Sequence, residues 1–141
     1  MAGAITHALG MDELRRQVLI VDGNDAVRES LRHAFALIDY RVLTAASSSQ
    51  AREHLATQHA DLFLLDLDTD TENDGMTLAC QLVGQHPGKP IIGMTTDAAR
   101  GTHAIGAPLT ALIEKPLDMP ALINQVTRLV DNPQPISPTL L

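Results

Sequence analysis

The chain has 141 residues, of which 45% are apolar, 2% are aromatic and 19% are charged, and its formal net charge is −7 at pH 7. This length and apolar content suit one globular domain with a core of Leu, Ile, Val, Ala and Met. The negative charge argues against a nucleic-acid surface, which requires clustered Lys and Arg. The one cysteine, Cys80, excludes an internal disulfide and suits a reducing compartment.

No apolar run approaches the roughly 20 residues of a membrane-spanning helix, so we expect no membrane contact. The segment Met1–Gly10 lacks the basic start and the long apolar centre of a secretion signal. We therefore expect a cytoplasmic protein.

Five short apolar runs bounded by turn-forming or polar residues predict five β-strands. In chain order they are Val18–Val21, Tyr40–Ala45, Leu62–Leu65, Pro90–Met94 and Leu109–Glu114. Apolar residues at helical spacing predict amphipathic helices after the first, second, third and fifth strands. We expect Asp25, Ser47 and Asp118 to cap the first, second and last of these helices.

The helices are expected from Asp25 onward, from Ser47 to about His59, from Gly75 to about Gln85, and over Met119–Val130. Cys80 lies in the middle of the third helix among apolar neighbours, and we expect it to be a buried structural thiol. The segment Ala98–Pro108 contains Gly101, Gly106 and a proline, which leave room for only a short helix.

Strands that alternate with helices predict a parallel sheet with right-handed crossovers and helices on both faces. The nearly continuous apolar composition of the strands agrees, because parallel strands are buried on both faces. We therefore predict an α/β domain with a doubly wound five-stranded parallel sheet over residues 17–131. Residues 1–16 are expected to form an N-terminal extension, and the proline-rich residues 132–141 a flexible C-terminal tail.

Four polar side chains follow four different predicted strands: Asp22, Asp66, Thr95 and Lys115. The carboxyl ends of parallel strands meet at one edge of a sheet, where open α/β sheets bind their ligands. Two carboxylates suit a hard cation such as Mg²⁺. A hydroxyl and an ammonium can bind phosphoryl oxygens, and a carboxylate can accept a phosphoryl group. Each residue alone could be an ordinary turn residue, but together they indicate phosphoryl chemistry.

These residues stand in motifs that resemble the receiver domain of two-component response regulators. The motifs are VLIVDGND, FLLDLD followed by DG, PIIGMTT and EKP, and the resemblance spans about Gln17 to Val130. It implies a flavodoxin-like, doubly wound fold that takes a phosphoryl group from a histidine kinase or a histidine phosphotransfer protein. Such a domain is a regulator in a phosphorelay and not a metabolic enzyme. Beyond self-phosphorylation and autodephosphorylation, its output is altered binding of a downstream protein.

The resemblance also implies a role for each site residue. Asp66 is the phosphoacceptor, and Mg²⁺ is held by Asp22, Asp66 and the backbone carbonyl of Asp68. Lys115 pairs with the acceptor and then with the phosphate. Thr95 is the switch hydroxyl that moves toward the phosphoryl group. The peptide bond that follows Lys115 is often cis in the family.

The chain departs from the family's pattern in its metal site. The family usually has two adjacent acids after the first strand, and the second position here is Gly23. The loss of a carboxylate should weaken Mg²⁺ binding, because few ligands of this ion are supplied by protein. Asp25, Asp68 or a water molecule could take its place.

The chain also departs from the pattern in its switch. The aromatic switch position, three residues before Lys115, is Leu112, which has no ring to couple to the movement of Thr95. Thr96 is bulkier than the small residue usual beside the acceptor, which should slow access to it. The shortened fourth helix alters the face that many receivers use for dimers, so a homodimer stays an open interpretation.

Two alternatives stay open. Gly23 and Leu112 favour a pseudo-receiver, which has the same fold, is not phosphorylated and acts only as a docking module. The segment from Asp66 to Asp68 also resembles the DxD motif of haloacid-dehalogenase-type phosphatases. Against a phosphatase, Asp70 stands where that motif usually has Thr or Val, and no acidic pair follows Lys115.

Overall fold

The computed structural model describes residues 15–68, 74–106 and 108–131 of the chain. The predicted N-terminal extension, apart from Arg15 and Arg16, lies outside these residues. The predicted C-terminal tail and most of the acidic loop that follows Asp68 also lie outside them. Within the described residues, no helix is long and apolar enough to cross a membrane.

The secondary structure follows the predicted order. The strands are β1 (Gln17–Val21), β2 (Arg41–Ala45), β3 (Leu62–Asp66), β4 (Ile91–Thr95) and β5 (Ala111–Glu114). The α-helices are α2 (Asp25–Leu37), α3 (Ser48–Thr57), α4 (Asp74–Gln85) and α5 (Met119–Asp131), and two single 3₁₀ turns, η1 (Ala98–Arg100) and η2 (Thr102–Ala104), lie between β4 and β5. The described residues between β4 and β5 therefore hold no α-helix, in agreement with the prediction of a shortened fourth helix.

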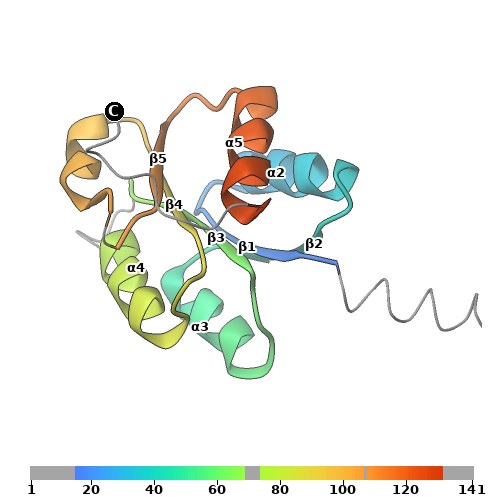
Figure 1. The fold of residues 1–141 in the computed structure, drawn as a ribbon, viewed down its shortest axis with the longest axis horizontal. Helices are drawn as coiled ribbons and strands as arrows, with labels where there is room; N and C mark the ends of the chain where they lie inside the picture. The colour runs from blue at the N-terminus through green and yellow to red at the C-terminus, as the bar shows by residue number, and fades with distance from the viewer. Residues whose placement is uncertain (1–14, 69–73, 107, 132–141) are drawn as a thin grey trace, which may run out of the picture.

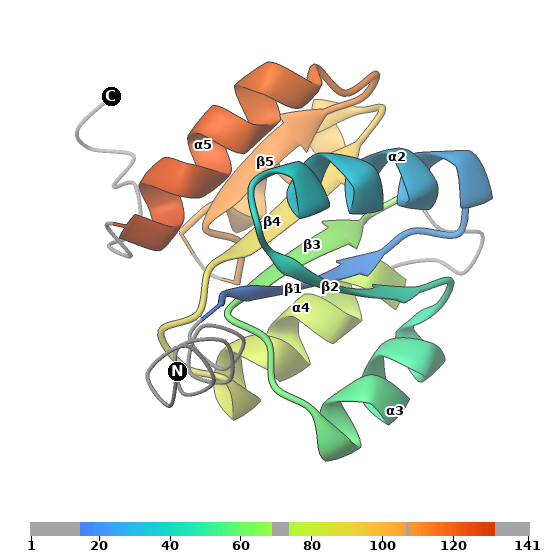
Figure 2. The same ribbon diagram turned by 90° about the vertical axis from the view of Figure 1, so that its right-hand side faces the viewer.

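The five strands form one sheet in the order β2-β1-β3-β4-β5, and each neighbouring pair is parallel. Helices α2 and α5 cover one face of this sheet, and α3 and α4 cover the other (Figure 1; the same layers are seen from the side in Figure 2). The predicted doubly wound α/β fold is confirmed.

Alternation along the strands divides the core into two layers. In β1, Val18 and Ile20 pack toward α2 and α5, whereas Leu19 and Val21 pack toward α3 and α4. The largest side chains of the two layers are Phe35 of α2 and Phe63 of β3, both fully buried. Because successive side chains of a strand point to opposite faces, an apolar run with no polar break is what a sheet covered on both sides requires.

The register of the sheet brings the strand ends to one edge. Val21 of β1 pairs with Leu65 of β3, Asp66 of β3 pairs with Met94 of β4, and Thr95 pairs with Glu114 of β5. The residues that follow these positions therefore meet on the same side of the sheet.

Two predictions about α2 and α4 are wrong. The cap of α2 is Asn24, whose side chain accepts a hydrogen bond from the backbone N–H of Val27, and not Asp25. Cys80 is exposed, because the buried stripe of α4 runs through Leu78, Ala79 and Leu82 and turns Cys80 outward. The predicted caps Ser47 and Asp118 are confirmed, each by a bond from a backbone N–H three residues later.

Candidate functional site: two buried carboxylates bridged by a lysine

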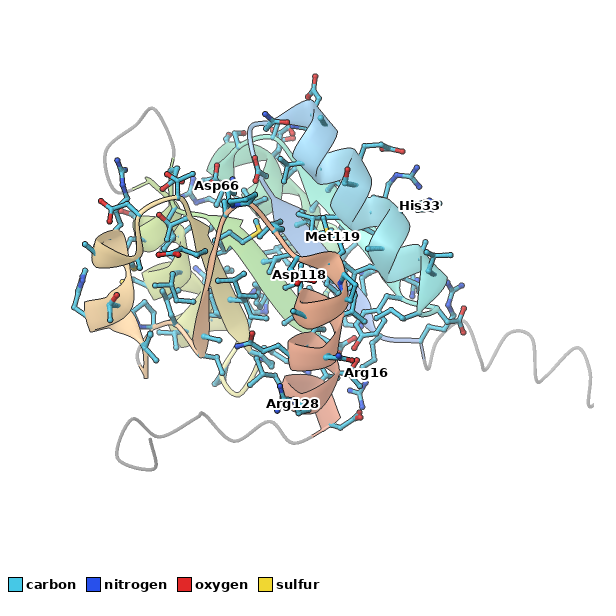
Figure 3. The ribbon with its side chains drawn as sticks, turned by 90° about the horizontal axis from the view of Figure 1, so that it is seen from above. Arg16, His33, Asp66, Asp118, Met119 and Arg128 are labelled. Atoms are coloured by element: carbon cyan, nitrogen blue, oxygen red, sulfur yellow. The ribbon has the colours of Figure 1, made fainter. Side chains whose placement is uncertain are left out.

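Two carboxylates and one lysine meet at the edge of the sheet. The Nζ atom of Lys115 lies 2.9 Å from Oδ2 of Asp22 and 3.2 Å from Oδ1 of Asp66. The side chains of Asp22 and Asp66 are only 1% and 8% exposed. Figure 3 shows Asp66 toward the end of the molecule where α5 begins at Met119, with Arg16 and Arg128 toward the other end. A cation between two buried acids offsets the cost of removing both from water.

The electrostatics of Lys115 follow from this contact. Burial acts to lower the pKa of its ammonium group, but the hydrogen bond and charge of Asp22, together with those of Asp66, outweigh burial. The net effect raises the pKa of Lys115 above its ordinary value, so the lysine is a fixed cation beside Asp22 and Asp66. The Lys115–Pro116 peptide bond is cis, as the resemblance implied.

Short backbone turns orient the two carboxylates. The backbone N–H of Asn24 donates to Oδ1 of Asp22 at 2.8 Å, and the backbone N–H of Asp68 donates to Oδ1 of Asp66 at 2.9 Å. In Asp66, Oδ1 thus receives both the lysine and a backbone donor. Among the described residues no donor is bonded to its Oδ2.

The backbone of Asp66 is held by a close approach of α4. A Cβ atom placed on Gly75 would overlap the carbonyl oxygen of Asp66 and lie 3.3 Å from its carbonyl carbon. Only glycine fits where the first turn of α4 touches the end of β3. This contact gives a physical reason for the glycine that ends the DG motif.

The hydroxyl of Thr95 is bonded to Asp68 rather than to Asp66. Thr95 is fully buried, and its Oγ1 lies 2.6 Å from Oδ1 of Asp68 and 3.0 Å from the carbonyl oxygen of Asp97. The backbone N–H of Thr96 donates to the other oxygen, Oδ2, of Asp68 at 2.6 Å. Nε of Arg100 lies 3.7 Å from Oδ1 of the same carboxylate.

These donors determine the charge of Asp68. Partial burial acts to raise the pKa of its carboxyl group, but the hydrogen bonds from Thr95 and Thr96, with a smaller contribution from Arg100, outweigh burial and lower it. The contact of the Asp68 side chain with Thr95 and Thr96 is not among the roles predicted from the sequence, which were metal binding by the Asp68 carbonyl or carboxylate. The signal that could have revealed this contact is the parallel register of β3 and β4, which sets Asp68 opposite the residues after Met94.

The four residues predicted from the strand ends therefore share one edge but form two groups. Asp22, Lys115 and Asp66 form the first group, and Thr95 with Asp68 forms the second. The turn in which Asp68 N–H bonds to Asp66 Oδ1 connects them.

Compared with the family's pattern, this edge of the sheet lacks the carboxylate that the second acid would supply, because that position is Gly23. A Cβ on Gly23 would meet only the carbonyl oxygen of Ala46, at 3.8 Å, so a side chain there has room. Asp25 is paired with Arg28 and its side chain is 92% exposed, and the carboxylate of Asp68 is occupied by Thr95 and Thr96. Neither acid replaces the absent carboxylate.

The remaining oxygen donors suit a hard cation in kind. They come from the carboxylates of Asp22 and Asp66, which one Lys115 ammonium already bridges. In the part of the chain that the structure describes, no cluster of three or more His, Cys, Asp or Glu side chains is arranged to hold a metal. Two carboxylates that share a cation fit Mg²⁺, which usually keeps several water ligands.

Leu112 packs into the core at the position where the family usually has an aromatic residue. A Cβ on Gly101 would lie 2.9 Å from Cδ1 of Leu112, and one on Gly93 would lie 3.3 Å from the same atom. Leu112 and Leu67 thus fill the space above two glycines, in the core layer on the α3 and α4 side. The side chain is held by packing and carries no polar group to follow Thr95.

A mainly apolar groove of about 470 Å³ opens beside Lys115. Residues of α2 and of the segment that leads into α5 line it, among them Ala26, Val27, Lys115, Leu117 and Met119. A partner seated in this groove would lie next to the bridged carboxylates.

Comparisons with known proteins agree with this fold. The profile of the response regulator receiver domain matches residues 18–127. The chain is 32% identical over 117 residues to the CAI-1 autoinducer sensor kinase/phosphatase CqsS of Vibrio cholerae, over 79% of this chain and 17% of that protein. It is 27% identical over 121 residues to the response regulator MprA of Mycobacterium tuberculosis, over 84% of this chain and 52% of that protein.

The fold is also found among solved structures. The CheY-like response regulator receiver domain protein of Methanospirillum hungatei superimposes with a TM-score of 0.76 at 22% identity, over 83% of this chain and 94% of that one. The chain spans about half the length of MprA and about a sixth of CqsS. The profile match covers most of the chain, and the chain therefore belongs to the receiver domain family of two-component response regulators.

Proposed function

We propose that this receiver domain accepts a phosphoryl group on Asp66 from a phosphohistidine and thereby changes its binding to a downstream protein. The observation that carries the proposal is the buried pair of carboxylates bridged by Lys115 at the carboxyl edge of the sheet. Family membership supports it, because receiver domains work with histidine kinases or histidine phosphotransfer proteins and are generally not enzymes.

The hydrogen bonds of Asp66 favour one of its two oxygens as the nucleophile. Oδ1 already accepts from Lys115 and from the N–H of Asp68, so Oδ2 is the oxygen that attacks phosphorus. The P–N bond of the phosphohistidine breaks as the P–O bond forms, and the imidazole leaves with the electron pair of the P–N bond. Lys115 stabilises the negative charge that gathers on the phosphoryl oxygens.

Asp22, Asp66 and the carbonyl of Asp68 are the groups that would hold Mg²⁺. The bound ion offsets the repulsion between the acceptor carboxylate and the incoming phosphoryl group. Gly23 supplies no carboxylate, so we expect this domain to need a higher Mg²⁺ concentration than a receiver with two adjacent acids.

The groove beside Lys115 is where we place the phosphodonor. Its apolar lining from α2 and the start of α5 suits the apolar face of a partner helix that carries the phosphohistidine. A cytoplasmic exchange accords with the free, exposed Cys80, since a reducing compartment preserves thiols.

Three features favour the second candidate, a pseudo-receiver that docks without phosphorylation. They are Gly23, Leu112 and the engagement of Thr95 and Thr96 by Asp68. A haloacid-dehalogenase-type phosphatase is the third interpretation, and it requires release of phosphate with turnover.

Intact-mass measurement after incubation with Mg²⁺ and a small-molecule phosphodonor tests the proposal. We expect a mass increase of one phosphoryl group in the native chain and none in Asp66→Asn. The absence of an adduct at every Mg²⁺ concentration would contradict the proposed phosphorylation and leave the pseudo-receiver as the favoured interpretation. Sustained release of phosphate from sugar phosphates would instead support the phosphatase.

A further inference from the structure

The side chain of Asp68 occupies two hydrogen-bond donors at the acceptor edge. Its Oδ1 lies 2.6 Å from the Thr95 hydroxyl oxygen, and its Oδ2 lies 2.6 Å from the Thr96 backbone nitrogen. The first distance lies within the usual range for a hydrogen bond from a hydroxyl to a carboxylate, and the second is shorter than is usual for an N–H donor. One carboxylate thus takes both donors in a bidentate arrangement.

The same two donors face the place where a modified Asp66 would carry its charge. Asp66 pairs with Met94 in the sheet, so Thr95 and Thr96 are the next residues along β4 at this edge. A phosphoryl group on Asp66 would bring three anionic oxygens toward them. A hydroxyl and a backbone N–H that converge on one anion are suited to bind another anion of similar charge.

We propose that the Asp68 carboxylate is a built-in competitor of the phosphoryl group, which must be displaced from Thr95 and Thr96 before these donors can bind phosphoryl oxygens. This inference rests on the proposed function of Asp66. Asp68 acts here through Thr95 and Thr96 and is a positioning residue. Its charge also repels an incoming phosphoryl group, so both effects slow acceptance.

The structure allows the side chain of Asp68 to be tested apart from its backbone. The N–H that bonds to Asp66 and the carbonyl expected to bind Mg²⁺ both belong to the backbone, and Asp68→Ala retains them. Asp68→Asn keeps the size of the side chain but removes its charge, which weakens the two hydrogen bonds. Asp25→Asn is the matched control, because it removes an exposed acid near the site that is paired with Arg28.

The first measurement needs no phosphodonor. Amide hydrogen exchange of Thr96, followed by NMR, reports whether its N–H is held by the Asp68 side chain. We expect exchange to be faster by about tenfold or more in Asp68→Ala, by less in Asp68→Asn, and unchanged in Asp25→Asn. An unchanged Thr96 amide in a folded Asp68→Ala protein would overturn the inference.

The second measurement is the rate at which the mass adduct forms with the small-molecule phosphodonor. We expect a rise of about tenfold in Asp68→Ala, a smaller rise in Asp68→Asn, and no change in Asp25→Asn. Equal rates of adduct formation in the native chain and Asp68→Ala would overturn the proposal that Asp68 competes with the phosphoryl group, but would leave the proposed function of Asp66 intact. The absence of an adduct in every variant would overturn both proposals. An adduct in Asp68→Ala alone would show the competitor at full strength.

Discussion

Replacement of Gly23 by aspartate should strengthen Mg²⁺ binding. A Cβ at this position meets only Ala46 O at an ordinary contact distance of 3.8 Å, and the backbone of Gly23 is not in the left-handed region. The substitution should therefore be accommodated without strain. It adds a carboxylate next to Asp22, at the position where the family usually has its second acid.

The size of the effect follows from the charges at the site. Asp22 and Asp66 carry two negative charges and Lys115 carries one positive charge, so the groups in contact sum to −1. Two unit charges about 4 Å apart attract by about 1 kcal/mol in bulk water. A carboxylate at that distance from a divalent cation therefore contributes about 2 kcal/mol, or about thirtyfold in affinity.

Titration with Mg²⁺, followed by the NMR shifts of backbone amides at the site, measures this affinity. Gly23→Asn is the matched control, because it adds a side chain of the same shape without charge. We expect tighter binding in Gly23→Asp and little change in Gly23→Asn. Equal affinities in the native chain and Gly23→Asp would refute the view that position 23 weakens the metal site.

Three other predictions concern Lys115, the glycines of α4 and the single tyrosine. In urea unfolding, Lys115→Met should lower the free energy of unfolding by about 3 kcal/mol, because two buried carboxylates lose their cation. Added Mg²⁺ should recover part of the lost free energy. An unchanged free energy of unfolding in Lys115→Met would contradict the prediction. Gly75→Ala should destabilise the fold, because the new Cβ would overlap the Asp66 carbonyl oxygen. Gly84→Ala should stabilise the fold by about 0.5 kcal/mol, because a Cβ on Gly84 meets no neighbouring atom within 4 Å. Equal effects of the two substitutions would refute the close approach of α4 to Asp66. Burial raises the pKa of Tyr40, so its absorbance titration should have a midpoint above that of the urea-unfolded chain. The contribution of Tyr40 to stability should be constant below the unfolded pKa of about 10 and be lost as the pH rises through the folded pKa. Coincident midpoints in the folded and unfolded chains would contradict this prediction.

The sheet could be predicted from the sequence because each strand is an apolar run, and such a strand must be covered by other elements on both faces. The same logic predicted that residues after different strands meet, and the register brings Asp22, Asp66, Thr95 and Lys115 to one edge. The prediction of helix caps was less certain to succeed where two capping residues are adjacent in the sequence. Asn24 and Asp25 are both good capping residues, and the turn after β1 placed the first of them at the cap.

The contacts within the site depend on side-chain directions that no local pattern contains. Asp68 and Thr95 are 27 residues apart, and their hydrogen bond exists because β3 and β4 are neighbours with a particular register. The inward packing of Leu112 depends on Gly93 and Gly101, which leave room for it from two other segments. Cys80 was misplaced because an apolar neighbourhood in sequence does not fix which side of a helix faces the sheet.

The location of the phosphoryl group on the chain tests the central claim most directly. The chain is incubated with Mg²⁺ and a histidine phosphotransfer protein that carries a labelled phosphoryl group. It is then digested into peptides, and the peptide that carries the label is identified. A parallel sample is treated with hydroxylamine, which cleaves acyl phosphates. The account predicts a hydroxylamine-sensitive phosphoryl group on the peptide that contains Asp66, and no label in Asp66→Asn. A label that resists hydroxylamine, or one that persists in Asp66→Asn, would contradict it.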